Sequence, residues 1–281
     1  MTEVMIHCND KGRSSVTNHM NEYIYCQFVL ISNERRMADI IEGRNPVIEA
    51  LKTGRPINKV LLARNIGLHS AVAEILHLSK SRRIPVEYVE RRYIDKLSAT
   101  SSHQGVIAYA SIKEYVALED LLTISSEKNE SPFYCILDGI EDPQNLGAII
   151  RTAEASGTHG VIIRSRRAVG LTATVAKASA GAVEYVPVAR VSNISQAMVA
   201  LKRSGVWVVG IDQTGEILYT QVDFKLSTAI VIGSEGKGLS DLVKKRCDSL
   251  ASIPMLGRIT SLNASVAAAL VMYEAFKQRS C

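Results

Sequence analysis

Several features that would identify other classes of protein are missing from this sequence of 281 residues. It contains no run of about 18 uncharged apolar residues, so we expect no membrane-spanning helix. The five cysteines are scattered and include no C-x-x-C pair: Cys8, Cys26, Cys135, Cys247 and Cys281. We therefore expect neither a disulfide framework nor a metal site, and free thiols favour a cytoplasmic protein.

The sequence also lacks the two common phosphate-binding loops. The segment GSEGKGL at 233–239 has three glycines, but it fits neither the Walker spacing nor the dinucleotide pattern G-x-G-x-x-G. These absences argue against an enzyme that depends on nucleotide phosphates. The formal net charge of +5 permits a polyanionic partner without proving one.

The pattern along the chain predicts two domains behind an N-terminal extension. Residues 1–36 carry a short apolar patch but not the features of a signal peptide, and we interpret them as an extension, or a mis-called start, before a functional start at Met37. Residues 37–112 predict a small α/β domain. Residues 113–131 predict a short helix and a linker, and residues 132–281 predict a larger α/β domain.

The small domain is a candidate for binding nucleic acid. Short helices (from 45 to Gly54, 69–80 and 91–98) alternate with strands at 59–63, 86–89 and 106–110. Between residues 37 and 110 there are eleven Lys and Arg against seven Asp and Glu. Six of the basic residues cluster around one predicted strand and the helix after it, and they either contact phosphates or form an ordinary solvated surface: Lys80, Arg82, Arg83, Arg91, Arg92 and Lys96. The candidate RNA-binding residues are Arg44, Arg82, Arg83, His103 and Gln104. His103 and Gln104 could equally cap the following strand.

The larger domain predicts a parallel sheet covered by helices on both faces. Residues 133–137 form a nearly continuous apolar run, which a strand buried on both faces requires. Further strands are expected at 160–163, 186–189, 206–211 and 229–232, with a helix over 146–156 and a last helix over 263–277.

Three polar loops follow strands in this domain, where α/β sheets bind their ligands. The first, 138–147, opens a helix: Asn145 can cap that helix and Arg151 follows in its second turn, where the two side chains can converge. In isolation, this pair is better explained as a helix cap and a surface arginine. The second loop, 233–239, contains Glu235. The third, 252–265, carries Ser261 and Asn263 ahead of a helix rich in small residues.

Taken together, these loops resemble one family. NLGAIIRTAEASG, VIGSEGKGL and SIPMLGRITSLNASVAAALVMYEA are similar in order and spacing to the three motifs of the SpoU/TrmH group of SPOUT RNA ribose methyltransferases, over residues 133–279. Upstream, EGRNPVIEAL and SSHQGV resemble the substrate-recognition domain of bacterial enzymes that methylate guanosine 2′-hydroxyls of large-subunit ribosomal RNA. Only the N-terminal extension is left unmatched.

The resemblance implies a fold, a cofactor and partners. The fold is a parallel α/β domain with a deep trefoil knot, preceded by a domain similar to a ribosomal protein. The cofactor is S-adenosylmethionine, held mainly by main-chain groups at Gly233, Ile253 and Leu262, with Ser261 and Asn263 shaping the pocket. The partners are large-subunit ribosomal RNA and a second copy of the chain in a homodimer. No metal is required.

The chemistry needs a proton acceptor, because a ribose 2′-hydroxyl is weakly acidic. The resemblance gives this task to Arg151, although arginine is effectively always protonated. Two versions stay open: Arg151 is transiently neutral and acts as the base, or it grips the neighbouring phosphate while another group takes the proton. Asn145 would position Arg151 or the ribose, and Glu235 would hold Arg151 or its own loop.

Two other functions remain open from the sequence. One is a ribose methyltransferase for transfer RNA, and the other is a non-catalytic RNA-binding factor in ribosome assembly. The modified nucleotide, and the choice between naked RNA and an assembly intermediate as substrate, are not fixed by the residues.

Overall fold

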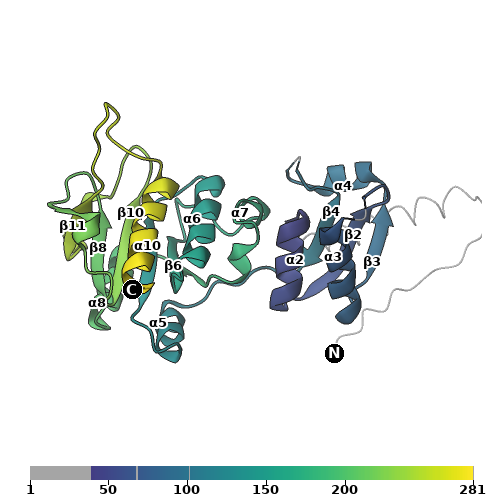
Figure 1. The fold of residues 1–281 in the computed structure, drawn as a ribbon, viewed down its shortest axis with the longest axis horizontal. Coiled ribbons are helices and arrows are strands. Elements are labelled where there is room, and N and C mark those ends of the chain that lie inside the picture. Colours follow the sequence, from purple (N-terminus) through teal and green to yellow (C-terminus); the bar gives the residue numbers. More distant parts are fainter. Residues whose placement is uncertain (1–38, 68, 101, 281) are drawn as a thin grey trace, which may run out of the picture. The chain divides into compact units, whose positions relative to one another are not determined.

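The computed structural model describes residues 39–67, 69–100 and 102–280. The predicted extension 1–36 and the predicted start at Met37 lie outside these residues. Asp39–Cys281 forms one unit, and its described residues contain a four-stranded and a seven-stranded sheet (Figure 1).

The four-stranded sheet has the order β1-β4-β2-β3, in which only β2 and β3 run parallel. Helices α2 and α3 bury Val47, Leu51 and Ile75 with the sheet in one apolar core. Helix α2 ends at Gly54, as predicted, since its φ of 82° lies in the left-handed region that glycine adopts readily. The elements are β1 (Asp39–Glu42), α2 (Arg44–Thr53), β2 (Ile57–Ala63), α3 (Ser70–Ser81), β3 (Val86–Val89), α4 (Arg91–Leu97) and β4 (Val106–Ala110).

The seven-stranded sheet is parallel throughout, as the sequence predicted, with the order β7-β6-β5-β10-β8-β11-β9. Its elements, with the preceding helix, are α5 (Leu118–Glu127), β5 (Phe133–Asp138), α6 (Pro143–Ala155), β6 (Gly160–Arg164), α7 (Ala173–Ala178), η1 (Ala182–Glu184), β7 (Val188–Val191), α8 (Ile194–Arg203), β8 (Trp207–Ile211), β9 (Ile217–Leu218), η2 (Tyr219–Gln221), β10 (Thr228–Gly233), α9 (Asp241–Arg246), β11 (Ser249–Ser252) and α10 (Ala264–Ser280).

Strand β5 shows why both faces of this sheet are covered. Phe133 and Cys135 point into one core with α6, α7 and α10, while Tyr134 and Ile136 point into a second core with α5, α8 and α9. Because successive strand residues face opposite sides, an unbroken apolar run is buried on both. Figure 1 shows α6 and α10 side by side, as their contacts also indicate.

The strand order creates a crevice at the carboxyl edge of the sheet. The chain runs from β5 outward through β6 to β7, and later places β10 between β5 and β8. Gly233, the last residue of β10, pairs in register with Asp138, the last residue of β5. The loops that follow β5 and β10 diverge from each other, and the crevice between such loops is where open α/β sheets bind ligands.

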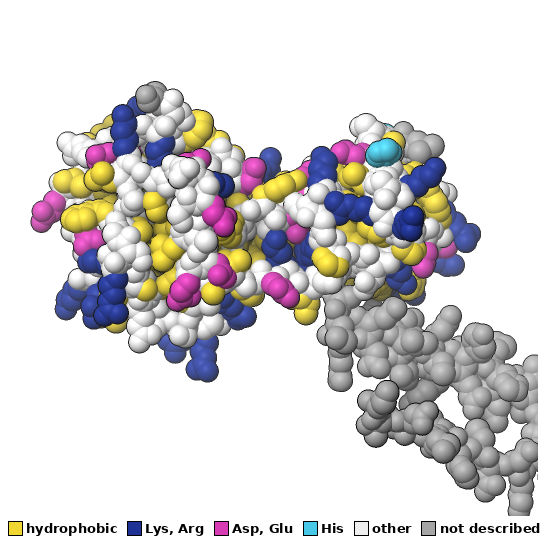
Figure 2. All heavy atoms as spheres, turned by 90° about the horizontal axis from the view of Figure 1, so that it is seen from below, with side chains coloured by type: hydrophobic (Ala, Val, Ile, Leu, Met, Phe, Trp, Pro, Cys, Tyr) yellow, Lys and Arg dark blue, Asp and Glu magenta, His cyan; other side chains and the backbone are white. Residues whose placement is uncertain are grey.

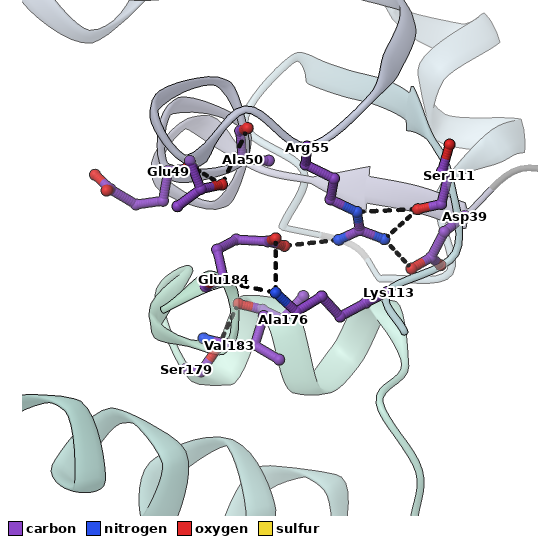
Figure 3. Close-up of polar contacts among 11 residues, drawn as sticks. Asp39, Glu49, Ala50, Arg55, Ser111, Lys113, Ala176, Ser179, Val183 and Glu184 are labelled. Atoms are coloured by element: carbon purple, nitrogen blue, oxygen red, sulfur yellow. Dashed lines mark hydrogen bonds and ion pairs between the residues drawn. The ribbon is translucent and has the colours of Figure 1, made fainter. Parts of the chain in front are cut away.

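A cluster of buried ion pairs links the four-stranded sheet to η1 (Figure 3). The guanidinium of Arg55 lies 2.7 Å from Asp39 Oδ2 and 2.6 Å from Glu184 Oε1, and it donates to the carbonyl of Ser111. Lys113 lies 3.7 Å from the other oxygen of Glu184. The charges of Arg55 and Glu184 are therefore paired where they are removed from water.

Candidate functional site

The candidate site is built where the three polar loops meet at the carboxyl edge of the large sheet. Glu235, in the loop after β10, accepts hydrogen bonds from Nδ2 of Asn145 and, at 2.9 Å, from Nδ2 of Asn263. Nδ2 of Asn263 also lies 3.0 Å from Oδ1 of Asn145. Segments more than a hundred residues apart in the sequence are thus joined through one carboxylate.

Asn145 does not cap α6, and that prediction was wrong. Asp142 is the cap residue: its Oδ1 accepts from the backbone N–H of Gln144 at 2.9 Å. Pro143 occupies the first helical position, so Asn145 lies inside the first turn, buried and turned toward Glu235. Its amide is therefore committed to the site.

Asn263 has two functions in the structure. Its Oδ1 accepts from the backbone N–H of Ser265 at 2.9 Å and of Val266 at 3.3 Å, which satisfies free donors at the start of α10. Its Nδ2 faces the other way, toward Glu235. The helix start and the loop after β10 are thereby fixed to each other.

Arg151 lies further along α6 and is exposed. Among the described residues it has no hydrogen-bond or ion-pair partner, and Glu235 instead holds the two asparagines. Glu235 thus contacts two asparagines from other segments and not Arg151, and its predicted task of holding its own loop stays a prediction. No hydrogen bond joins Arg151 to Asn145, and their predicted convergence near the start of the helix stays a prediction. All donors of Arg151 are free for a ligand.

A cavity of about 240 Å³ opens beside this cluster. Four of the predicted cofactor-binding residues line it: Gly233, Ile253, Ser261 and Leu262. Glu235 reaches its wall, and Asn263 contacts Glu235. The walls combine apolar side chains with main-chain groups of two loops, an arrangement that suits a small molecule with both apolar and polar parts.

Gly233 is required by the protein itself. A Cβ atom there would overlap the backbone of Gly238 and Leu239, because the loop folds back onto the end of β10. The loop is closed by hydrogen bonds between the backbones of Ser234 and Gly238, at 2.8 and 3.2 Å. Glycine therefore allows a close approach of two backbone segments in this position, and the tight loop forms one wall of the cavity.

Sequence reasoning missed an ion pair in the cavity wall that lies outside the three polar loops. Asp212 follows β8, and its Oδ2 lies 2.8 Å from Nζ of Lys244 in α9. Burial raises the pKa of Asp212, but hydrogen bonds from Lys244 and Thr214 outweigh this and keep it below the usual value. The carboxylate is therefore ionised at neutral pH. In the sequence, the signal that could have identified Asp212 is its position directly after a predicted strand of the parallel sheet.

The predicted RNA-binding residues do not form one contact cluster. His103 is buried, with Nε2 at 2.8 Å from Asp95 and Nδ1 accepting from the N–H of Gly105. Gln104 is exposed and accepts from the backbone of Arg44. The side chains of Arg82 and Arg83 are exposed at the end of α3. Figure 2 shows Lys and Arg side chains, in dark blue, spread over the surface of this region.

Within the described ranges, no group of three or more His, Cys, Asp or Glu is placed to hold a metal ion. In the same ranges, no helix has the length and apolar character needed to cross a membrane.

Comparison with known families gives two matches that together cover most of the chain. Residues 132–273 match the SpoU rRNA methylase family, and residues 40–116 match a domain described as RNA 2′-O ribose methyltransferase substrate binding. The first match contains all three loops of the candidate site.

Similar proteins and structures agree with these matches. A protein of Bacillus subtilis (strain 168) assigned to the TrmH family of tRNA/rRNA methyltransferases is 48% identical over 86% of this chain and 96% of its own length. The SpoU methyltransferase AviRb of Streptomyces viridochromogenes, crystallised with AdoMet, aligns with a TM-score of 0.75 at 27% identity over 88% of this chain and 92% of its own. An AdoMet-bound rRNA methyltransferase of Sinorhizobium meliloti aligns with a TM-score of 0.72 at 26% identity over 95% of this chain and 97% of its own.

Proposed function

Because the chain belongs to the SpoU rRNA methylase family and is an S-adenosylmethionine-dependent RNA methyltransferase, we propose that it methylates a ribose 2′-hydroxyl of large-subunit ribosomal RNA at a guanosine. The observation that carries this proposal is the junction at Glu235, which joins the three loops beside a cavity of about 240 Å³.

The cavity has the chemistry that the cofactor needs. S-adenosylmethionine supplies a sulfonium-bound methyl group, which is already electrophilic. Ile253 and Leu262 provide apolar surface, Gly233 and Leu262 provide main-chain groups, and Ser261 provides a hydroxyl. We therefore assign the cofactor to this cavity, with these residues and Asn263 around it.

Arg151 is the proposed catalytic residue. The ribose oxygen must lose its proton as its bond to the methyl carbon forms and the methyl–sulfur bond breaks. An exposed guanidinium without an internal partner either accepts that proton while transiently neutral or holds the adjoining phosphate. Asn145 and Glu235 position the loops around the reacting groups, because they are fixed to each other rather than to Arg151.

The choice of RNA rests on the domain of residues 40–116. Its match to a substrate-binding domain of RNA 2′-O ribose methyltransferases supports an RNA substrate, and the resemblance of EGRNPVIEAL and SSHQGV to enzymes of large-subunit ribosomal RNA favours that RNA. Transfer RNA is compatible with the same family, and it is the second candidate because the similar proteins are assigned to tRNA/rRNA methyltransferases. Arg44, Arg82, Arg83 and Gln104 are proposed to contact RNA, whereas the buried His103 would shape the loop that presents Gln104.

We further propose that two copies of the chain associate through α6 and α10. A groove of about 620 Å³ lies between these helices, lined by apolar side chains that include Val266, Leu270 and Tyr273. Ala148 and Thr152, which flank Arg151 on α6, line the same groove. The groove therefore adjoins the part of α6 that carries Arg151, as expected if a second copy completes the site. The deep knot implied by the family resemblance remains a prediction.

The proposal is tested by transfer of a radiolabelled methyl group from S-adenosylmethionine. Unmodified large-subunit RNA and transfer RNA are offered in parallel, and the label is mapped by nuclease digestion. We expect label on a guanosine ribose of the large-subunit RNA. Label on transfer RNA alone would replace the substrate, and a protein that binds no cofactor would contradict the enzymatic function.

A further inference from the structure

Asp212 is an ionised side chain in the wall of the cavity that none of the proposed catalytic steps uses. Its side chain is 6% exposed. Oδ1 accepts hydrogen bonds from the backbone N–H of Thr214 at 3.0 Å and from its hydroxyl at 2.7 Å, and Oδ2 lies 2.8 Å from Nζ of Lys244. Three bonds thus hold the carboxylate in one orientation.

The carboxylate keeps capacity for a further donor. Two carboxylate oxygens offer about four acceptor positions, and the protein fills three of them. Both Asp212 and Lys244 line the cavity together with Gly233 of the neighbouring strand. A buried charge at the edge of a binding cavity with an acceptor position left over points to a ligand that donates a hydrogen bond there.

The cofactor carries three kinds of donor: the hydroxyls of its ribose, the amino group of its adenine and its charged α-ammonium group. Lys244 disfavours the last, because its own ammonium lies 2.8 Å from the same carboxylate and would repel a second positive charge. The Asp212–Lys244 pair has no net charge, which suits an uncharged donor. Adjacent ribose hydroxyls offer two such donors, and a carboxylate at the end of a neighbouring strand is a common partner for them.

We propose that Asp212 binds the ribose hydroxyls of S-adenosylmethionine, while Lys244 holds the carboxylate in position. This inference rests on the proposed function, since it places the cofactor in the cavity. Asp212 is then a specificity-determining residue, which selects a ribonucleoside cofactor without taking part in methyl transfer.

The test measures binding of S-adenosylhomocysteine and of its analogues lacking the 2′- or the 3′-hydroxyl, by isothermal titration calorimetry. The wild type should bind at least one deoxy analogue about tenfold or more weakly than S-adenosylhomocysteine, as expected for a hydrogen bond to a charged group. Asp212→Ala should bind S-adenosylhomocysteine about as weakly as the wild type binds that deoxy analogue. The variant should therefore no longer distinguish S-adenosylhomocysteine from the analogue. Asp212→Asn, which keeps an acceptor oxygen, should show a smaller loss.

Asp248→Ala is the matched control. Asp248 is also largely buried, at 15% exposure, and pairs with Lys202 at 2.6 Å, but it does not line the cavity. Its loss should leave the affinity for all three ligands unchanged. If Asp212→Ala does not fold, the comparison rests on Asp212→Asn, checked by thermal unfolding.

Two results would overturn the assignment of Asp212 while leaving the proposed function intact: a wild type that binds all three ligands equally, or an Asp212 variant that retains the wild-type discrimination. A wild type that does not bind S-adenosylhomocysteine would overturn both.

Discussion

At the scale of single residues, the candidate site depends on Glu235 as an acceptor for two asparagine amides. A carboxylate accepts hydrogen bonds and cannot donate them when ionised, so both amide nitrogens can turn toward it. Asn145 is buried, and its Nδ2 group would lose its hydrogen-bond acceptor if Glu235 were absent. The buried amide and the carboxylate therefore depend on each other, and Arg151 is left free for substrate.

Arg151→Ala should lower kcat by about 10²-fold or more, the range that general acid–base groups contribute. The affinity for S-adenosylhomocysteine should change little, because Arg151 does not line the cofactor cavity. Single-turnover methyl transfer and calorimetry measure the two quantities separately. Near-normal turnover of the variant would contradict both proposed functions of this residue.

Glu42 gives a prediction about pH. Its buried carboxylate accepts from the hydroxyls of Ser98 and Thr100, at 2.7 and 2.6 Å, and from the backbone N–H of Ala99. Burial raises the pKa of Glu42, but these hydrogen bonds outweigh burial and bring it below the usual 4.5. As the pH falls, the carboxylate of Glu42 is therefore protonated at a higher pH in the unfolded chain than in the folded protein. The stabilisation is complete above pH 4.5 and is lost as the pH falls through the lower pKa of the folded state.

Glu42→Gln should accordingly reduce the free energy of unfolding by about 1–3 kcal/mol at neutral pH, with the difference from the wild type shrinking below pH 4.5. Urea unfolding over a pH series measures this. Glu87→Gln, which removes an exposed pairing with Lys59 at 3.9 Å, should cost under about 1 kcal/mol at neutral pH. A difference in the free energy of unfolding between the wild type and Glu42→Gln that grows as the pH falls would contradict this prediction.

At the scale of secondary-structure elements, the loop after β10 forms only because of where its glycines lie. Gly233→Ala should abolish or severely weaken cofactor binding, because the new Cβ overlaps the backbone of Gly238 and forces the cavity wall to move. Gly236→Ala is the control: its φ is +81° but no atom lies within 4 Å of a Cβ there, so it should cost about 1 kcal/mol of backbone strain. Calorimetry and thermal unfolding compare the two variants.

Strands with long apolar runs were predictable, and so was the short β3 (VEYV), whereas three other short strands were missed. β5 and β10 carry enough consecutive apolar residues to be recognised alone. β1 (DIIE) and β11 (SLAS) begin and end with polar side chains, and β9 (IL) has only two residues, so none of these three segments shows the pattern of a strand by itself. Each is a strand because of its neighbours: β11 pairs with β8, and β1 pairs with β4. Tertiary pairing decides such segments.

The cap of α6 shows a similar limit within one loop. Asp142 and Asn145 are both good cap residues, and composition alone does not choose between them. Pro143 was the available signal, because proline favours the first helical position and so assigns the cap to the residue before it. Gly233, Ile253, Ser261 and Leu262, which line the cavity from the second and third loops, followed from the family resemblance, but Asp212 lies in none of its motifs.

At the scale of the whole molecule, the ion-pair cluster at Arg55 joins the domain of the four-stranded sheet to η1 of the larger domain (Figure 3). Arg55→Met should destabilise the protein by about 3–5 kcal/mol, because it leaves the carboxylate of Glu184 buried without its main partner. The double variant Arg55→Met with Glu184→Gln should recover part of that loss. Urea unfolding measures the stability of both variants. If the single and the double variant are equally stable, the unpaired carboxylate of Glu184 is not the source of the lost stability.

Association of two copies would cover the apolar groove between α6 and α10. Leu270 is 39% exposed and Tyr273 is 50% exposed, although both are apolar enough to favour burial. Leu270→Asp should give a monomer in sedimentation velocity, because a carboxylate in an interface core loses its hydration without gaining a partner. Leu226→Asp is the control, since Leu226 is 60% exposed and does not line the groove. If the wild type is already a monomer, the groove has another occupant. If Leu270→Asp is monomeric and also inactive while still binding S-adenosylhomocysteine, the second copy is needed for methyl transfer and not for holding the cofactor.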